Sequence, residues 1–211
     1  MRFSDRTEAG QKLAQALERY RGQDGIVYPL PRGGVALGVE IARALAMPID
    51  LVIPRKIGHP HNPEYAIGAV TEDGDLVVNQ WEVSRVDLHW LDRQVARERQ
   101  EARRRRELYL GDRKPLPTGG KTAILVDDGI ATGLTMRAAI RDLKNRHPAR
   151  IVVAIPVAPQ DTAERLAMEV DDVVGLEITD AYRGSVSAYY DYFPQLTDEE
   201  VIALLESLPA Q

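Results

Sequence analysis

The sequence predicts an α/β protein whose sheet is doubly wound and mostly parallel, with helices on its faces. Three features predict this fold: apolar runs without polar interruption, one-faced helical repeats between them, and glycine loops where a run passes into a helix. The five apolar runs expected to be buried strands are 25–30, 49–54, the run that begins at Thr122, 150–157 and 172–178. If the first two strands extend the sheet one way and the other three the opposite way, the strands that begin at Gly25 and Thr122 are neighbours. A ligand is then expected between their carboxyl ends.

The length and composition are those of one domain with elaborations. The chain has 211 residues, enough for a sizeable core, and a net charge of −5, which does not by itself imply a nucleic-acid surface. It has no cysteine, so disulfides and thiolate metal sites are excluded. No apolar stretch approaches the roughly 20 residues of a membrane span, and no secretory signal is visible at the N-terminus. We therefore expect a cytoplasmic protein that binds neither membrane nor nucleic acid.

The first helix is expected to begin at Ser4 or Asp5, which are good N-cap residues, and to end near Gly22. The first strand then runs into the loop Pro31-Arg32-Gly33-Gly34, and a second helix follows. A glycine loop that opens a helix exposes backbone amides that can bind an anion. This loop therefore predicts either an anion cradle or simply a tight turn between strand and helix.

Two cations, Arg55 and Lys56, follow the strand expected at 49–54. The carboxyl ends of parallel strands are where α/β proteins bind ligands. A leaving group such as pyrophosphate also needs positive charge at that place. The alternative is that both side chains are solvated loop cations.

The segment from His59 to Asn79 differs in character from the rest of the core. Two prolines make 59–63 unsuitable for regular structure. The short β runs 66–70 and 75–79 flank an acidic turn with glycine, which predicts a hairpin that can add an antiparallel edge. His59 and His61 have the spacing of two metal ligands, but no third ligand is evident, so loop histidines without a metal are favoured.

A long charged helix is expected from Ser84 to Tyr109, followed by a linker at 111–120. Its four arginines at 103–106 form the most basic run of the chain, and glutamates four positions away can pair with them. A solvated helix face or a subunit contact is favoured over a nucleic-acid surface.

The stretch from Ile124 to Thr135 reads I-L-V-D-D-G-I-A-T-G-L-T and carries the strongest functional signal. A buried strand passes into the acidic pair Asp127-Asp128, then into a glycine loop and a helix, and such a loop favours a phosphate. Two carboxylates would repel a phosphate unless they contact sugar hydroxyls, a metal ion or both. The pattern therefore predicts a phosphorylated-sugar site, with a chance arrangement in another doubly wound protein as the alternative. No cation lies nearby in the sequence, so the two acids are expected to repel each other in the empty protein.

The last part of the chain is expected to hold two further helices. One begins at 161–164, and Thr197 with Glu200 predicts a capped final helix. Between them, 179–195 is rich in aromatic residues, which either stack on a planar ring or pack against the protein. Tyr189 and Tyr190 are the candidates for contact with such a ring.

The acidic motif resembles the phosphoribosyl-diphosphate (PRPP) signature of the type I phosphoribosyltransferases, and the resemblance in organisation covers about 25–178. In that family the acidic pair holds the ribose 2′- and 3′-hydroxyls, and the loop wraps the 5′-phosphate. The resemblance implies that ribose and the 5′-phosphate are bound by Asp127, Asp128, Gly129, Ile130, Ala131, Thr132, Gly133, Leu134 and Thr135. It implies that pyrophosphate is bound by Arg32, Gly33, Gly34, Arg55 and Lys56.

The resemblance also sets the expected domain organisation, cofactor and assembly. Within a single domain, 1–211, the core is expected at about 22–79 and 119–178, and a small hood that selects the acceptor at about 80–118 and 179–211. The resemblance implies Mg²⁺ as the cofactor, held through PRPP with no firm protein ligand. A homodimer is common in the family.

Two shorter matches resemble the adenine phosphoribosyltransferases. R-K-x-G at 55–58 resembles their equivalent stretch, and Glu64-Tyr65 resembles a pair in the lid that closes over their active site. Hypoxanthine-guanine enzymes have an acid inside the phosphate loop, whereas this chain has Ala131, as adenine enzymes do. Glu64 is therefore the candidate general base. The implied catalytic residues are Asp127, Asp128, Glu64 and Lys56.

The implied reaction is transfer of ribose 5-phosphate from PRPP to a nitrogen acceptor with release of pyrophosphate, as in nucleotide salvage. The acceptor is expected to be a purine-like nucleobase. The alternative is a regulatory protein that binds PRPP without turnover. Such a regulator normally carries a DNA-binding domain or a basic face, and neither is visible in the sequence, so the enzyme is favoured.

Overall fold

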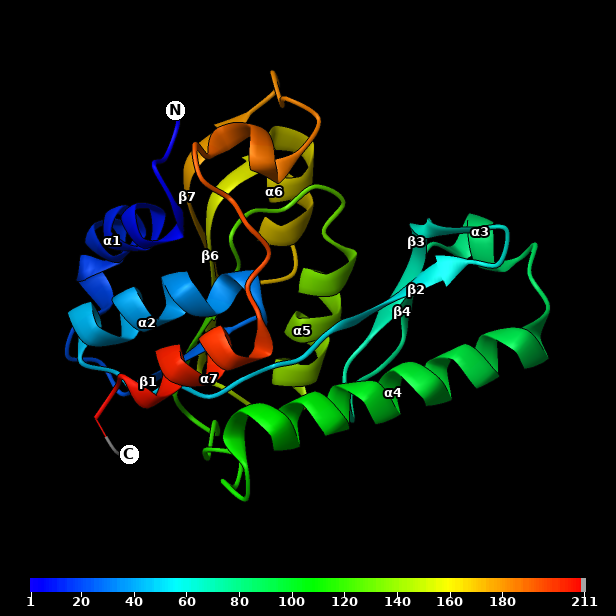
Figure 1. The fold of residues 1–211 in the computed structure, drawn as a ribbon, viewed down its shortest axis with the longest axis horizontal. Coiled ribbons are helices and arrows are strands. Elements are labelled where there is room, and N and C mark those ends of the chain that lie inside the picture. The colour runs from blue at the N-terminus through cyan, green and yellow to red at the C-terminus, as the bar shows by residue number, and fades with distance from the viewer. Residues whose placement is uncertain (210–211) are drawn as a thin grey trace.

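The computed structural model describes residues 1–209, and its central element is a parallel sheet (Figure 1). The strands are β1 (Gly25–Pro29), β5 (Thr122–Val126), β6 (Arg150–Pro159) and β7 (Asp172–Thr179), in the order β1-β5-β6-β7. β1 and β5 pair in parallel, with Gly25 opposite Thr122. The predicted neighbour relation between these strands is confirmed, and it places the ends of two glycine loops side by side.

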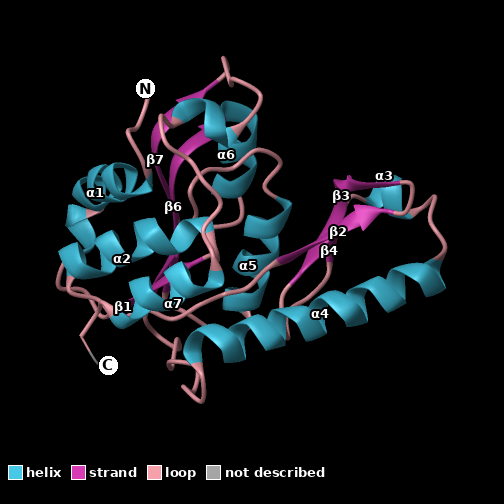
Figure 2. Ribbon diagram, in the orientation of Figure 1, coloured by secondary structure: helices cyan, strands magenta, loops and turns pink. Residues whose placement is uncertain are grey.

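Helices cover both faces of this sheet, as the doubly wound prediction requires (Figure 2). One face is covered by α1 (Arg6–Ala16), α2 (Gly33–Leu45) and α7 (Asp198–Glu206), and the other by α5 (Leu134–Lys144) and α6 (Gln160–Ala167). Side chains of a strand alternate between faces. Ile124 and Val126 therefore pack on the α1–α2 side, whereas Ala123 and Leu125 pack on the α5–α6 side.

The helix ends follow local sequence signals. Asp5 caps α1, since its side chain accepts a bond from the backbone of Glu8. Thr197 and Glu200 form the predicted capping box of α7. Two short 3₁₀ helices, η1 (Glu18–Tyr20) and η2 (Val186–Tyr189), lie in connecting segments. The last two residues of the hood predicted at 179–211 lie outside the described part of the chain.

The prediction of a strand at 49–54 is wrong. The segment is buried and lies beside β1, but it makes only a single bridge, between Ile49 and Val27. The ladder stops there because its next bond would need an N–H from Pro29 of β1, which proline lacks. The Leu51 backbone is satisfied by side chains: its amide donates to Asp50 Oδ1, and its carbonyl accepts a bond from Arg106. The parallel sheet therefore has four strands instead of five.

A second, antiparallel sheet projects from the body as an arm (Figure 1). It contains β2 (Arg55–His59), β3 (Asn62–Val70) and β4 (Val77–Val78). β3 pairs with β4, which confirms the predicted hairpin. The prediction that 59–63 is irregular is wrong, because β2 also pairs with β3 around a turn at Pro60 and His61. The prolines are accommodated by the turn and by irregular register near Gly58.

Two helices hold the base of the arm. Leu91 on α4 (Leu88–Leu110) packs on one face, with Ile57 and Ile67. Ala138 on α5 packs on the other face, against Ala69 and Val77 of the arm. The short α3 (Gln80–Val83) connects β4 to α4. The predicted long helix is thus confirmed, and it supports the arm.

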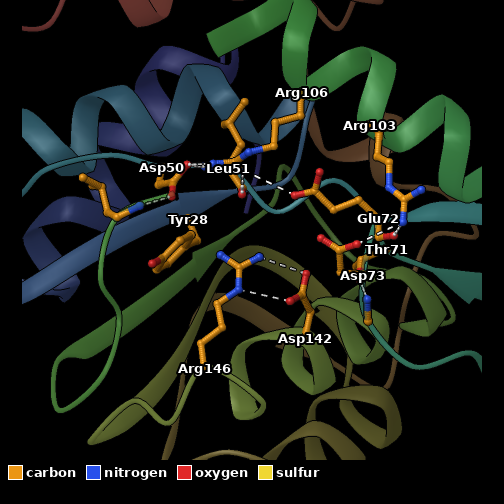
Figure 3. A network of polar contacts seen from close by, with 12 residues as sticks. Tyr28, Asp50, Leu51, Thr71, Glu72, Asp73, Arg103, Arg106, Asp142 and Arg146 are labelled. Atoms are coloured by element: carbon orange, nitrogen blue, oxygen red, sulfur yellow. Dashed lines mark hydrogen bonds and ion pairs between the residues drawn. The ribbon is translucent and has the colours of Figure 1, made fainter. Parts of the chain in front are cut away.

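A buried polar network joins the arm to the body (Figure 3). Arg106 of α4 donates from Nη2 to Asp50 Oδ1 at 2.8 Å and from Nη1 to the Leu51 carbonyl at 2.9 Å, and its Nη1 lies 3.6 Å from Glu72 Oε1. The prediction of a solvated or subunit-contact face for 103–106 is therefore wrong for Arg106, which is 8% exposed. Its partners lie far away in the sequence, so helix periodicity did not reveal them.

No helix in residues 1–209 combines the length and the apolar character needed to cross a bilayer.

Candidate functional site

A cleft of about 360 Å³ opens at the carboxyl ends of β1 and β5. This is the place that the predicted strand order gives for a ligand. Three separate segments line the cleft: 30–31 after β1, 54–56 at the start of the arm, and 127–135 after β5. Val186 of η2 completes the lining. Its half-buried position in a connecting segment far along the chain gave no signal in the sequence.

The acidic pair forms one wall of the cleft. The Asp127 carboxylate accepts a bond from the Asp128 amide at 2.9 Å, which fixes its orientation. Burial, together with the negative charge of Asp128, raises the pKa of Asp127 well above its ordinary value. Burial also raises the pKa of Asp128, although the guanidinium of Arg6 opposes that shift.

Arg6 is the cation partner of Asp128. Its Nε donates to Asp128 Oδ2 at 2.8 Å across 122 positions of sequence. The expectation that both acids lack a cation and simply repel each other is therefore wrong for Asp128. Arg6 is the first residue of α1, and nothing in the local sequence marks it as part of a site.

The loop after the acids leads into the N-terminus of α5. Gly133 is the N-cap with φ of 80°, a conformation that glycine adopts without strain, and no side chain caps the helix. The first-turn amides of a helix have no intrahelical partner, so this end provides donors and a positive dipole for an anion. The cleft lining includes all the predicted loop residues except Leu134, whose side chain packs against the base of the arm.

The glycines after β1 allow close packing. A Cβ at Gly33 would lie 1.9 Å from Asp128 Oδ2, and one at Gly34 would lie 2.6 Å from the Val126 carbonyl oxygen. Both glycines therefore let the first turn of α2 sit directly against the acidic pair. Arg32 does not line the cleft, since its Nη1 lies 3.8 Å from Asp198 Oδ1 on α7. The peptide bond between Pro31 and Arg32 is cis.

The two predicted cations do line the cleft. Arg55 is held by α4, because its Nε donates to Glu98 Oε2 at 2.9 Å. Lys56 is exposed, forms no ion pair with any residue in 1–209, and lies close enough to lower the pKa of Asp127 by its charge. The free ammonium of Lys56 is thus available to an anionic ligand.

The lid residues and the histidines lie apart from the cleft. Glu64 and Tyr65 are exposed on β3, and the Tyr65 hydroxyl donates to Glu82. His59 and His61 lie beside the turn of the same hairpin, with ring centroids 5.6 Å apart. The structure therefore does not bring Glu64 to the acidic pair.

The aromatic residues proposed for an acceptor ring are packed in the core. Tyr189 is 1% exposed and Tyr190 is 4% exposed, so neither ring face is available to a ligand, and this prediction is wrong. The Tyr190 hydroxyl instead donates to the Asp128 carbonyl at 2.7 Å. Tyr190 therefore holds the backbone of Asp128 in place.

The donor set of the cleft suits a hard cation only in part. Carboxylate oxygens such as those of Asp127 and Asp128 are ligands that Mg²⁺ prefers. Within the described residues, however, no group of three His, Cys, Asp or Glu side chains is placed to hold a metal ion. An ion at this wall would need further oxygens from a bound ligand.

Comparisons with known proteins show which family the sequence matches. The family model for the phosphoribosyl transferase domain matches residues 6–192. A Mycobacterium tuberculosis (strain H37Rv) protein named "Putative phosphoribosyl transferase Rv0571c" is 39% identical over 206 residues, which are 97% of this chain and 46% of that protein. The chain thus spans about half the length of the curated relatives that it matches.

Solved structures show the same fold. The crystal structure of TT1426 from Thermus thermophilus is 43% identical, covers 97% of this chain and 98% of its own, and has a TM-score of 0.81. The AQ2163 protein from Aquifex aeolicus has a TM-score of 0.51 at 8% identity, covering 82% of this chain and 74% of its own. The second likeness concerns the fold alone.

Proposed function

Because the chain belongs to the type I phosphoribosyltransferase family, we propose that it transfers ribose 5-phosphate from PRPP to a nitrogen acceptor and releases pyrophosphate. The acceptor that we propose is a purine-like nucleobase. One observation carries this proposal: a partly buried acidic pair, an uncapped helix N-terminus and a free lysine line the same cleft. Sugar hydroxyls, a phosphate and a diphosphate need these three kinds of partner.

The chain's own groups would divide the work along the ligand. The carboxylates of Asp127 and Asp128 accept hydrogen bonds from the ribose hydroxyls. The loop from Gly129 to Thr135 and the first-turn amides of α5 bind the 5′-phosphate. Arg55 and Lys56 face the diphosphate from the start of the arm.

The reaction would exchange one bond at the sugar C1. The bond from C1 to the diphosphate oxygen breaks and its electron pair leaves with pyrophosphate, while the acceptor nitrogen forms the new bond to C1. The acceptor N–H proton passes to a base, for which we propose Glu64 on the β2–β3 hairpin. Positive charge from Lys56 stabilises the departing pyrophosphate, and the fixed cleft supplies orientation.

Mg²⁺, when bound, would lower the charge of the leaving group. Asp127 is the protein group best placed to support the ion, because its carboxylate is not engaged by Arg6. Homodimer formation and a role in nucleotide salvage are further proposals, supported by the family resemblance.

Titration calorimetry with PRPP, with Mg²⁺ and then with EDTA, tests the proposed ligand. We expect tight binding that depends on Mg²⁺, and equal or absent heats under both conditions would refute it. A pyrophosphate-release screen over nucleobases then tests the transfer. PRPP binding without release on any base would indicate a protein that senses PRPP.

A further inference from the structure

We infer that Arg6 is a positioning residue of the proposed PRPP site, which holds Asp128 so that one of its carboxylate oxygens is presented to the ribose. This inference rests on the proposed function. It assigns a role to a residue outside every loop that lines the cleft.

The guanidinium of Arg6 is fixed by three contacts of different kinds. Its Nε donates to Asp128 Oδ2 at 2.8 Å, and its Nη1 donates to the Pro194 carbonyl at 2.6 Å. Its Cζ lies 3.7 Å from the centroid of the Phe193 ring, a cation–π distance. Arg6 is also only 8% exposed. A buried guanidinium held in this way has little freedom to move from Asp128.

The contact leaves the two oxygens of Asp128 in different states. Oδ2 is engaged by Arg6, whereas Oδ1 accepts no bond from any other residue in 1–209. The backbone behind the carboxylate is also held, because the Tyr190 hydroxyl donates to the Asp128 carbonyl. Arg6 thus holds Asp128 through one oxygen and leaves the other without a hydrogen-bond donor among the described residues. That oxygen can accept a hydrogen bond from a sugar hydroxyl.

A purely structural ion pair would look similar, so the test must separate the ribose end of the ligand from the diphosphate end. Pyrophosphate needs the cations near Lys56, and Asp127 where Mg²⁺ is bound, but not Asp128, which is the acid that Arg6 holds. PRPP needs Asp128 as well. Loss of the contact between Arg6 and Asp128 should therefore weaken the binding of PRPP and not that of pyrophosphate.

The experiment measures binding of PRPP and of pyrophosphate, each with Mg²⁺, to wild type, Arg6→Gln and Arg6→Lys by calorimetry, with thermal melts of each protein. Lys12→Gln is the control, since it removes an exposed ion pair with Glu8 on the same helix. We expect Arg6→Gln to lower the affinity for PRPP about 10- to 100-fold, the range for loss of a charged hydrogen bond. The affinity for pyrophosphate should be unchanged. Arg6→Lys keeps the charge but cannot bond both Asp128 and the Pro194 carbonyl, so its PRPP affinity should lie between those of Arg6→Gln and wild type. It serves as the test variant if Arg6→Gln does not fold.

Two results would overturn the inference: equal weakening of both ligands, or a folded variant that binds PRPP as wild type does. Wild type that binds no PRPP would refute the proposed function itself, which is a different outcome.

Discussion

Gly33, the first residue of α2, packs so closely on Asp128 that a Cβ at Gly33 would lie 1.9 Å from Oδ2 of the aspartate. The two glycine loops of the chain are therefore coupled by steric contact. Any side chain at this position after β1 would push against the carboxylate that follows β5. The positive end of α2 also lies beside this acid, which favours its charged form.

Gly33→Ala should strongly impair the site. A methyl group does not fit at 1.9 Å, so Asp128 or α2 must move, at a cost of roughly 1–3 kcal/mol of stability. PRPP affinity should fall as well, because the same carboxylate is displaced. Gly119→Ala is the control, since the nearest atom to its Cβ would be 3.9 Å away. Calorimetry and thermal melts measure both effects, and a Gly33→Ala protein with wild-type PRPP affinity would contradict the prediction.

Asp127→Asn should separate function from stability. Burial raises the pKa of Asp127, so its charge is unfavourable in the empty protein, and asparagine can still accept the bond from the Asp128 amide. The free energy of unfolding should therefore be equal or higher, while PRPP binding weakens by roughly 1–3 kcal/mol. Asp128→Asn is the comparison: it leaves Arg6 without its charged partner and should lower the melting temperature. An Asp127→Asn protein that melts below Asp128→Asn would show that the assignment is wrong.

Asp50→Asn should destabilise the joint between arm and body. The carboxylate accepts bonds from Arg106, from the Leu51 amide and from the Leu116 amide, and it is 3% exposed. Removing its charge leaves a buried guanidinium poorly compensated, so urea denaturation should show a loss of about 3 kcal/mol or more. Arg104→Gln removes an exposed pair with Glu101 on the same helix and should change stability by less than about 1 kcal/mol. A similarly small loss of stability in both variants would show that the network around Asp50 does not stabilise the junction between arm and body.

Glu72→Gln should make the stability less sensitive to pH. Burial raises the pKa of Glu72 above its ordinary value of 4.5, with the charge of Arg106 opposing the shift. A raised folded-state pKa contributes stability that is full below 4.5 and is lost as pH rises through the folded-state pKa. The melting temperature of the variant, relative to wild type, should therefore increase as the pH is raised above 4.5. A difference that stays constant across this range, or that favours wild type at higher pH, would exclude the mechanism.

Glu64→Gln tests whether the hairpin closes over the cleft. Glu64 is exposed on β3 and does not line the cleft, so it can act as the base only if the β2–β3 hairpin bends toward the ligand. We expect kcat on an identified acceptor to fall about 100-fold, with PRPP affinity unchanged. Asp75→Asn alters an exposed carboxylate on the same arm and should have normal turnover. Normal turnover in Glu64→Gln would exclude it as the base.

The sequence by itself determined the strand–loop–helix units and the acidic motif. Thr122–Val126 is continuously apolar after its first residue because both of its faces are covered, so its strand character is visible in a short window. The two acids and the loop to Thr135 follow this strand directly in the sequence. Such a motif binds its ligand through contiguous residues, so a short window of sequence reveals it. The predicted adjacency of β1 and β5 then followed from general rules of doubly wound sheets.

Tertiary structure alone decided which groups neutralise the buried charges. Asp128 pairs with Arg6 across 122 positions, and Arg106 pairs with Asp50 across 56. Pairing between distant segments also kept 49–54 from forming a strand, because Pro29 of β1 has no N–H to continue the ladder beyond the bridge between Ile49 and Val27. Local periodicity reports which face of an element is buried, but a buried charge is stabilised by whichever opposite charge the completed fold places beside it, and that partner leaves no trace in neighbouring sequence.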